Sequence, residues 1–358
     1  MNKKHIIFIL PEYSTMPMGG YKVVFEYSNR LVSDGFEVGI IYPFFLSLSK
    51  STFRNTIKRC LYFVYYLVAY RKDKTCWFPL DKKVKEIFVW NLNEKYIPKA
   101  DYYIATAMET SENLNQYKTI ESHQKYYLIQ GLEDWTWGKE AVLKTWKYKL
   151  NKIVISPWLQ SMVQSLGESS TLIENGVDRA LLKKEILPVD RDKFTVMMLY
   201  HKQKLKGSED GLRALLLVKK KYPSLKAVWF GASAKPANLP DWIEYNQQPV
   251  ESVLNELYNR SAIYIGPSHS EGFGLTIGEA MMCGCAVACT DAGGYLTMAK
   301  DRKTALISKI GEVQSLADNI IELIENDVLR CNIADNGSSA IQSFTWAKAY
   351  KTFKKLFE

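Results

Sequence analysis

Short apolar segments alternate with longer amphipathic segments along the chain, and this alternation limits the fold more than any other feature. The short segments are rich in Val, Ile, Tyr and Phe, as strands are. The longer ones, such as 211–222 and 313–326, carry apolar residues at the three-to-four spacing of a helix. Strand, turn and helix in repetition predict parallel sheets covered by helices on both faces. The expected strands are 6–10, 36–42, 84–90, 102–106, 126–130, 152–156, 194–200, 227–232, 262–267, 286–290 and 305–308.

The length of the chain predicts two domains. Its 358 residues, 47% of them hydrophobic, are too many for one ordinary core and apolar enough for two. The segment 178–193 is highly charged and carries Pro188, so we expect the break between the domains there. Two open sheets facing each other would form a cleft, with the ligand at the carboxyl ends of the strands. The expected fold class is therefore α/β, with two Rossmann-like domains.

The amino-terminal residues and the cysteines bear on the location of the protein. The apolar run 5–10 is too short for a signal-peptide core, and no run reaches the roughly 18 apolar residues of a spanning helix. Three of the six cysteines, Cys283, Cys285 and Cys289, share one apolar run without a nearby histidine, so we interpret them as buried thiols rather than zinc ligands. We expect a soluble or peripheral protein of the reducing cytoplasm.

The region between Lys50 and Lys85 holds much of the net charge of +9. Ten lysines and arginines stand there against two aspartates, and they enclose the apolar aromatic run 61–69. Such a segment can lie in the headgroup layer of an anionic membrane. It can equally be a helix packed on its own domain with solvated charges. No nucleic-acid-binding motif accompanies the basic residues, so nucleic acid is not an expected partner.

Two stretches place glycines where a strand passes into a helix. Gly19 and Gly20 precede a helix whose inner face is expected to be Val23, Val24, Tyr27 and Leu31. Glycines there allow backbone N–H groups to approach an anion, although Gly-Gly before a helix can also be only a turn. The full Gly-x-Gly-x-x-Gly fingerprint is missing, which disfavours an ordinary dinucleotide-binding fold.

The second stretch, 262–284, sets two glutamates on either side of a glycine-bracketed turn. Glu271 lies in the loop after an expected strand, and Glu279 lies just over one turn inside the helix that begins near Leu275. The N–H groups between them suit a phosphate, whereas the carboxylates suit hydroxyl donors. Hydroxyl-bearing groups on both sides of a diphosphate describe a sugar nucleotide. The alternative is one solvated loop glutamate and one glutamate on a helix surface.

Together these motifs resemble the retaining glycosyltransferases of GT-B fold that are often called family 4. The resemblance is carried by Glu-x7-Glu at 271–279, by CGCAVACTDAGG at 283–294 and by IENGVD at 173–178, and it covers nearly the whole chain. It implies an acceptor-binding domain over 1–180 and a donor-binding domain over 181–340. It also implies that the last helix, within 341–358, packs back on the first domain.

The resemblance assigns roles to single residues. Glu279 would hold the ribose hydroxyls, Glu271 a hydroxyl of the transferred sugar, and Lys206 the charge of the leaving diphosphate. Backbone at the start of the helix would meet the phosphates, which Gly20 would approach from the other domain. The expected donor-binding set is Gly20, Asn175, Gly274, Leu275, Thr276 and Glu279.

The sequence departs from the family pattern at several positions. His201, beside Lys202, stands where an arginine is common, and either residue could supply the positive charge. Thr297 stands where a glutamate is common. A family histidine on the acceptor side has no match here. Gln130 and Glu133 lie near its place, either as acceptor-side residues or as part of a plain loop.

The resemblance implies transfer without a metal or other cofactor, from a UDP-, GDP- or dTDP-linked sugar to a glycan or lipid-linked acceptor. The setting would be bacterial surface polysaccharide synthesis at the inner face of the membrane. A sugar-nucleotide epimerase or hydrolase of the same superfamily is one alternative, but it needs further acid and base residues. A non-catalytic sugar-nucleotide-binding protein is another, which the departures at His201 and Thr297 leave open.

Overall fold

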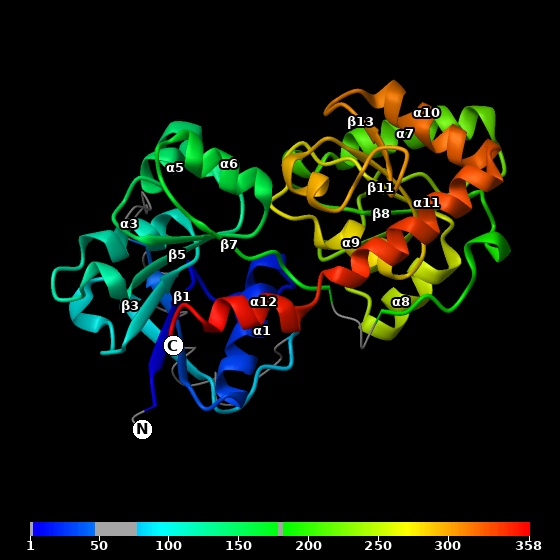
Figure 1. Ribbon diagram of the computed structural model, residues 1–358. Coiled ribbons are helices and arrows are strands. Elements are labelled where there is room, and N and C mark those ends of the chain that lie inside the picture. The colour runs from blue at the N-terminus through cyan, green and yellow to red at the C-terminus, as the bar shows by residue number, and fades with distance from the viewer. Residues whose placement is uncertain (1–2, 47–76, 178–181) are drawn as a thin grey trace. The chain divides into compact units, whose positions relative to one another are not determined.

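The computed structural model describes residues 3–46, 77–177 and 182–358. The chain divides into two compact units, drawn in Figure 1. The first consists of Met1–Ile155, Gln160–Ile173 and Tyr350–Glu358, and the second of Ser156–Leu159 and Glu174–Ala349. The last helix, α12 (Trp346–Lys354), thus contributes its end to the first unit and its beginning to the second.

The first unit is built on a parallel sheet that has seven strands in the described residues, in the order β3-β2-β1-β4-β5-β6-β7. Every pair in it is parallel, as the strand and helix alternation predicts. The strands are β1 (His5–Ile9), β2 (Glu37–Phe45), β3 (Lys85–Asn91), β4 (Tyr102–Ala105), β5 (Lys125–Ile129), β6 (Asn151–Val154) and β7 (Thr171–Leu172). The helices are α1 (Gly19–Ser33), α3 (Met108–Gln116), α4 (Asp134–Trp137), α5 (Lys139–Thr145) and α6 (Pro157–Ser165).

Helix α1 begins at Gly19 itself, so the two glycines form its first turn instead of preceding it. Its inner face is buried at all four expected positions, Val23, Val24, Tyr27 and Leu31. The Tyr27 ring stacks on Phe353 of α12, with ring centroids 4.0 Å apart. This contact anchors the end of the chain on the first unit, where Figure 1 shows α12 next to α1.

Among its described residues, the second unit has a parallel sheet of six strands in the order β10-β9-β8-β11-β12-β13. The strands are β8 (Thr195–Leu199), β9 (Lys226–Gly231), β10 (Ile243–Gln247), β11 (Ile263–Gly266), β12 (Ala286–Thr290) and β13 (Leu306–Ser308). The helices are α7 (Ser208–Lys221), α8 (Glu251–Arg260), α9 (Leu275–Met282), α10 (Val313–Glu325) and α11 (Asp327–Ala340).

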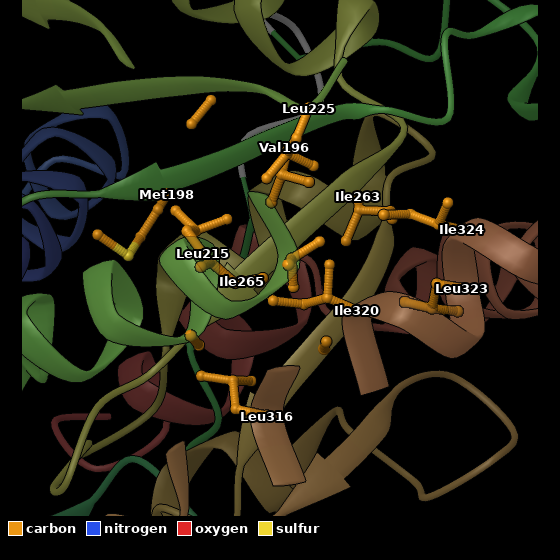
Figure 2. Packing of buried hydrophobic residues seen from close by; sticks show 14 of the residues in the cluster. Val196, Met198, Leu215, Leu225, Ile263, Ile265, Leu316, Ile320, Leu323 and Ile324 are labelled. Atoms are coloured by element: carbon orange, nitrogen blue, oxygen red, sulfur yellow. The ribbon is translucent and has the colours of Figure 1, made fainter. Parts of the chain in front are cut away.

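One face of this sheet forms a continuous apolar core with α7 and α10. Alternate strand residues such as Ile263 and Ile265 point into it, because successive side chains of a strand point to opposite faces. Leu215 of α7 and Ile320 of α10 cover them, as Figure 2 shows. Burial of these side chains, at about 25 cal/mol per Å² of apolar surface, holds the two helices on the sheet.

All eleven expected strands are present, with ends within a few residues of the predicted ones. Two strands were not expected: β7, which has two residues, and β10, an edge strand in which only Ile243 is buried. Both lie at the end of a sheet, where a strand needs little apolar pattern. They therefore give a weak signal in the sequence.

The cysteines of the apolar run 283–289 are buried, whereas most of the basic segment cannot be described. Cys283, Cys285 and Cys289 are fully buried free thiols, as interpreted from the sequence, and burial raises the pKa of Cys285 to about 11. Most of the basic segment 50–85, including its aromatic run, lies outside the described residues. Among the helices of the described ranges, none has the length and apolar character needed to cross a bilayer.

Candidate functional site

The order of the strands brings two loops of the second unit together. Strands β8 and β11 are neighbours, with Val196 paired to Ile263, although helices α7 and α8 and strands β9 and β10 lie between them in sequence. This is the point where the strand order reverses, and ligands of open α/β sheets bind outside the carboxyl ends of the strands there. The loops that follow β8 and β11 carry Lys206 and Glu271, respectively.

The Lys206 loop is held by close backbone packing. Gly207 has φ +64° and ends the short turn before α7, and a Cβ on it would lie 1.9 Å from the carbonyl oxygen of Pro267. Only glycine fits here, because a side chain would be strained at this φ and would collide with the neighbouring loop. The N–H groups of His269 and Ser270 donate to the carbonyl of Leu205. The two loops are thus joined directly.

Lys206 and Glu271 form an ion pair. Lys206 Nζ lies 2.9 Å from Glu271 Oε1, and the two side chains are 29% and 11% exposed. Ser268 Oγ donates to the same oxygen at 2.9 Å, and Tyr295 O–H approaches it at 3.5 Å. The expected leaving-group lysine and the expected sugar-binding glutamate are therefore in contact within one unit.

Helix α9 starts next to this pair. Gly274, with φ +90°, precedes its first residue, and a Cβ there would lie 2.4 Å from the Tyr295 ring. Helix geometry leaves the first N–H groups without intrahelical partners. Within the described part of the chain, no backbone carbonyl accepts from Leu275 or Thr276. These N–H groups and the helix dipole suit a bound anion.

Glu279 lies one turn inside α9, and its Oε2 accepts a hydrogen bond of 3.2 Å from the Tyr258 hydroxyl. Burial, followed by the nearby Glu279 carboxylate, raises the pKa of Tyr258 well above its usual value, so this hydroxyl stays a donor. Glu271 and Glu279 thus lie in loop and helix on either side of the α9 start, as the sequence predicts.

The two candidates for the second cation differ. Burial, followed by the Lys206 ammonium, lowers the pKa of His201. Its Nδ1 accepts from the N–H of Gln203 at 3.0 Å, which fits a neutral imidazole. Lys202 is exposed in the same loop. Lys202 is therefore the better source of positive charge near neutral pH.

Asn175, expected to bind the donor, lies in the loop after β7, near the end of the described range 77–177. It is only 1% exposed, and its Oδ1 has no partner among the described residues. The loop packs on α9, since a Cβ at Gly278 would meet Val177 at 3.0 Å. The hydroxyl of Thr297, where a family glutamate was expected, is also buried without a partner in the described ranges.

In the first unit, two expected site residues contact each other. Gln130 Nε2 donates to the carbonyl of Gly20 at 3.2 Å, so the loop after β5 meets the first turn of α1. The other amide atom, Gln130 Oε1, is buried and unpaired within the described residues. Gly20 and Gln130 both lie at the carboxyl edge of the sheet, where a ligand is expected.

Glu133 lies three residues after Gln130, directly before α4, and its side chain reaches the start of α3. Its Oε2 accepts from the N–H of Met108, the first residue of α3, at 2.9 Å. Burial raises the pKa of this carboxyl to about 7, against the lowering effect of that hydrogen bond, and Glu109 adds to the rise. A carboxyl with this pKa can accept or donate a proton near neutral pH, which is a property of acid–base groups.

Sequence reasoning missed three residues of these networks: Tyr258, Ser268 and Tyr295. Each reaches a predicted carboxylate through a hydroxyl, but each also lies in or next to an apolar segment, where it is expected to be core. The tyrosine that directly follows Gly293-Gly294 is the clearest of the three signals. In the described residues, no group of three or more His, Cys, Asp or Glu side chains could hold a metal ion.

Two units, each built on a parallel sheet with helices, have the architecture of the GT-B glycosyltransferases. Solved structures confirm this fold class. Sucrose-phosphate synthase from Thermosynechococcus elongatus has a TM-score of 0.73 over 99% of this chain and 98% of that chain, at 16% identity. Anabaena HepE, solved in complex with UDP and glucose, has a TM-score of 0.72 over 99% of both chains, also at 16% identity.

Sequence similarity points the same way. Residues 181–340 match the model of the family described as glycosyl transferases group 1. Phosphatidyl-myo-inositol mannosyltransferase of Mycobacterium leprae is 23% identical over 231 residues, which cover 61% of this chain and 62% of that protein. The chain spans a smaller share of several other curated relatives. Residues 181–340 are thus similar to the glycosyl transferases group 1, and the chain spans less than two thirds of the length of these curated relatives.

Proposed function

We propose that the protein is a retaining glycosyltransferase of family 4 that moves a sugar from a nucleotide-sugar donor to a glycan or lipid-linked acceptor. The observation that carries this proposal is the ion pair of Lys206 and Glu271 beside the start of α9, with Glu279 one turn further on. A cation, free N–H groups and two carboxylates suit a diphosphate with a hydroxyl-bearing group on each side. Ribose, diphosphate and sugar follow one another in this order in a sugar nucleotide.

In this proposal the N–H groups of Gly274, Leu275 and Thr276 bind the phosphates. Glu279 accepts hydrogen bonds from ribose hydroxyls and Glu271 from a hydroxyl of the sugar. The contact between Lys206 and Glu271 supports these roles, because the bond to be broken joins the sugar to the diphosphate. Asn175 and Gly20 remain proposed donor-binding residues.

The transfer breaks the bond between the anomeric carbon and the phosphate oxygen through an oxocarbenium-like state. The acceptor hydroxyl attacks from the same face, and its proton passes to the departing phosphate oxygen. Negative charge develops on that oxygen, and groups that already point at it lower the barrier. Lys206, the α9 N–H groups and Lys202 supply this stabilisation, so the scheme needs no metal ion.

On the acceptor side we propose Gln130 and Glu133. The amide at Gln130 is held by Gly20, and the carboxyl at Glu133 has a pKa of about 7, which supports a role in binding the acceptor hydroxyl. HepE was solved with UDP and glucose, which supports a nucleotide-sugar donor here. The mannosyltransferase relative is named for a lipid, which supports a lipid-linked acceptor. A membrane contact through the basic segment 50–85 is part of the proposal on the ground of its charge alone.

The test is a panel of UDP, GDP and dTDP sugars against the purified protein. A ligand that binds only the folded state raises the melting temperature. The proposal expects one nucleotide class to do so, Glu279→Ala to abolish the shift, and sugar transfer to appear when an acceptor is added. Donor turnover without acceptor would instead indicate a hydrolase or epimerase. Binding without any turnover would indicate a non-catalytic sugar-nucleotide-binding protein.

A further inference from the structure

The two oxygens of the Glu271 carboxylate have different surroundings. Oε1 accepts from two donors, Lys206 Nζ and Ser268 Oγ, both at 2.9 Å, and the Tyr295 hydroxyl lies 3.5 Å from it. Within the described ranges, Oε2 has no hydrogen-bond partner. One oxygen is therefore held, and the other is available to a ligand.

The directions of these hydrogen bonds follow from counting protons. Ser268 has one hydroxyl proton, and it goes to the carboxylate, which can only accept. The Tyr295 hydroxyl, 3.0 Å from Ser268 Oγ, must then be the donor in that contact. Burial raises the pKa of Tyr295 well above its usual value, so it keeps its proton. The chain of donation runs from Tyr295 through Ser268 to Glu271.

The hydrogen-bonded hydroxyls of Tyr295 and Ser268 are buried and closely packed. Tyr295 and Ser268 are 2% and 3% exposed. The Tyr295 ring occupies room left by two glycines, since a Cβ on Gly266 would lie 3.1 Å from it and one on Gly274 would lie 2.4 Å from it. Thr290 Oγ1 donates to the Ser268 carbonyl and fixes the serine from the other side. Two buried hydroxyls so constrained can hold a carboxylate in one orientation.

From this arrangement we infer that Ser268 and Tyr295 are positioning residues, which hold Oε1 of Glu271 so that Oε2 accepts a hydroxyl of the donor sugar. The inference rests on the proposed function. It also explains how Lys206 can serve the diphosphate. When the ammonium moves from Oε1 to the phosphate, Ser268 still donates to that oxygen and Tyr295 still donates to Ser268, so the carboxylate keeps its orientation.

The experiment compares Tyr295→Phe, Ser268→Ala and the double variant with wild type. The probes are the sugar nucleotide that the panel selects, UDP-glucose for a uridine-binding protein, and its nucleoside diphosphate, here UDP. Tyr222→Phe is the matched control, because the Tyr222 hydroxyl donates to Glu325 of the same unit, away from Glu271. Affinity for both probes and kcat/KM for the donor are measured for each protein.

We expect Tyr295→Phe and Ser268→Ala to bind the nucleoside diphosphate as wild type does, which also reports an intact second unit. Their kcat/KM for the sugar nucleotide should fall about tenfold, the size of one hydrogen bond to a charged group. The double variant should lose little more than Ser268→Ala alone, because residues that act through one another are not additive. The control should match wild type.

Three results would overturn the inference. These are unchanged sugar-nucleotide kinetics in both variants, equal losses for the sugar nucleotide and the nucleoside diphosphate, or losses that add in the double variant. A wild-type protein that binds no nucleoside diphosphate overturns the proposed function, and this inference falls with it. If the wild-type protein binds the nucleoside diphosphate and the variants turn the donor over as fast as wild type does, only the inference is overturned.

Discussion

Replacing Lys206 with alanine should slow sugar transfer far more than it destabilises the protein. At 2.9 Å from Glu271 Oε1, and with an effective dielectric constant of about 20, the ion pair has a gross attraction of about 6 kcal/mol. Desolvation of both partly exposed groups offsets most of this, and Ser268, held by Tyr295, still donates to the glutamate. We therefore expect a loss of about 1 kcal/mol in unfolding free energy, or a melting temperature lower by about 2–4 °C.

Loss of the Lys206 ammonium should raise the barrier to departure of the diphosphate more than it lowers the stability of the fold. Removing one preorganised group that faces a developing negative charge costs about 3–4 kcal/mol of transition-state stabilisation, which is a factor of 10²–10³ in rate. Release of nucleoside diphosphate in the presence of acceptor measures kcat/KM, and thermal melts measure stability. Lys204→Ala is the control, since it removes an exposed lysine from the same short turn. A folded Lys206→Ala protein within about fivefold of wild type would refute the reasoning.

Three further predictions concern other parts of the two sites. Glu279→Ala should weaken nucleoside diphosphate binding at least tenfold by calorimetry, because the ribose hydroxyls lose a charged acceptor; unchanged affinity would remove Glu279 from the site. Wild-type activity should rise with pH through an inflection near 7, because the carboxylate form of Glu133 accepts a hydrogen bond from the acceptor hydroxyl, and Glu133→Gln should abolish that inflection. If the inflection persists, another group titrates there. Gly207→Ala should cost more than about 2 kcal/mol in urea unfolding, because its Cβ would meet the Pro267 carbonyl at 1.9 Å and its φ is +64°; an unchanged midpoint would contradict the steric argument.

Most of the fold can be predicted from the sequence because buried parallel strands are nearly continuous apolar runs. The run AVACT at 286–290 became β12 with the same ends, since it is buried on both faces. Strand β10 was missed for the opposite reason. It lies at the edge of its sheet, and its sequence IEYNQ buries only Ile243, so backbone pairing with β9 defines it more than side-chain pattern does.

The contacts of the charged segment near the domain boundary could not be predicted from its composition. Composition suggests a solvated linker at 178–193, yet Arg191 is only 6% exposed and donates to the carbonyls of Ile186, Tyr258 and Ser261. Asn259 accepts from the N–H of Glu185 in the same way. These partners are backbone groups brought close by the fold, which no local pattern in the sequence can reveal.

The carboxylates and the lysine of the candidate site were predictable, whereas their hydroxyl partners were not. Glu271 and Glu279 were predicted from their spacing around a glycine-bracketed turn, and Lys206 from the resemblance to a family. Tyr295 offers no such signal, because a buried tyrosine is common in a core. Its importance depends on a hydroxyl 3.0 Å from Ser268, which is a fact of three-dimensional packing.

Glu271 and Glu133 have different surroundings, and this difference fits their proposed tasks. Glu271 meets an ammonium and two hydroxyls, a surrounding suited to a fixed hydrogen-bond acceptor. Glu133 meets one backbone N–H and is otherwise desolvated, which raises its pKa to about 7. Because folding raises that pKa above the ordinary value of 4.5, the folded state holds the proton more tightly, and the contribution of Glu133 to stability falls as the pH rises from about 4.5 to 7. The pH range in which Glu133 becomes a carboxylate is therefore the range in which it stops favouring the folded state. Glu133→Gln should accordingly flatten both the activity profile and the stability profile between these pH values, whereas a purely structural carboxyl would affect stability alone.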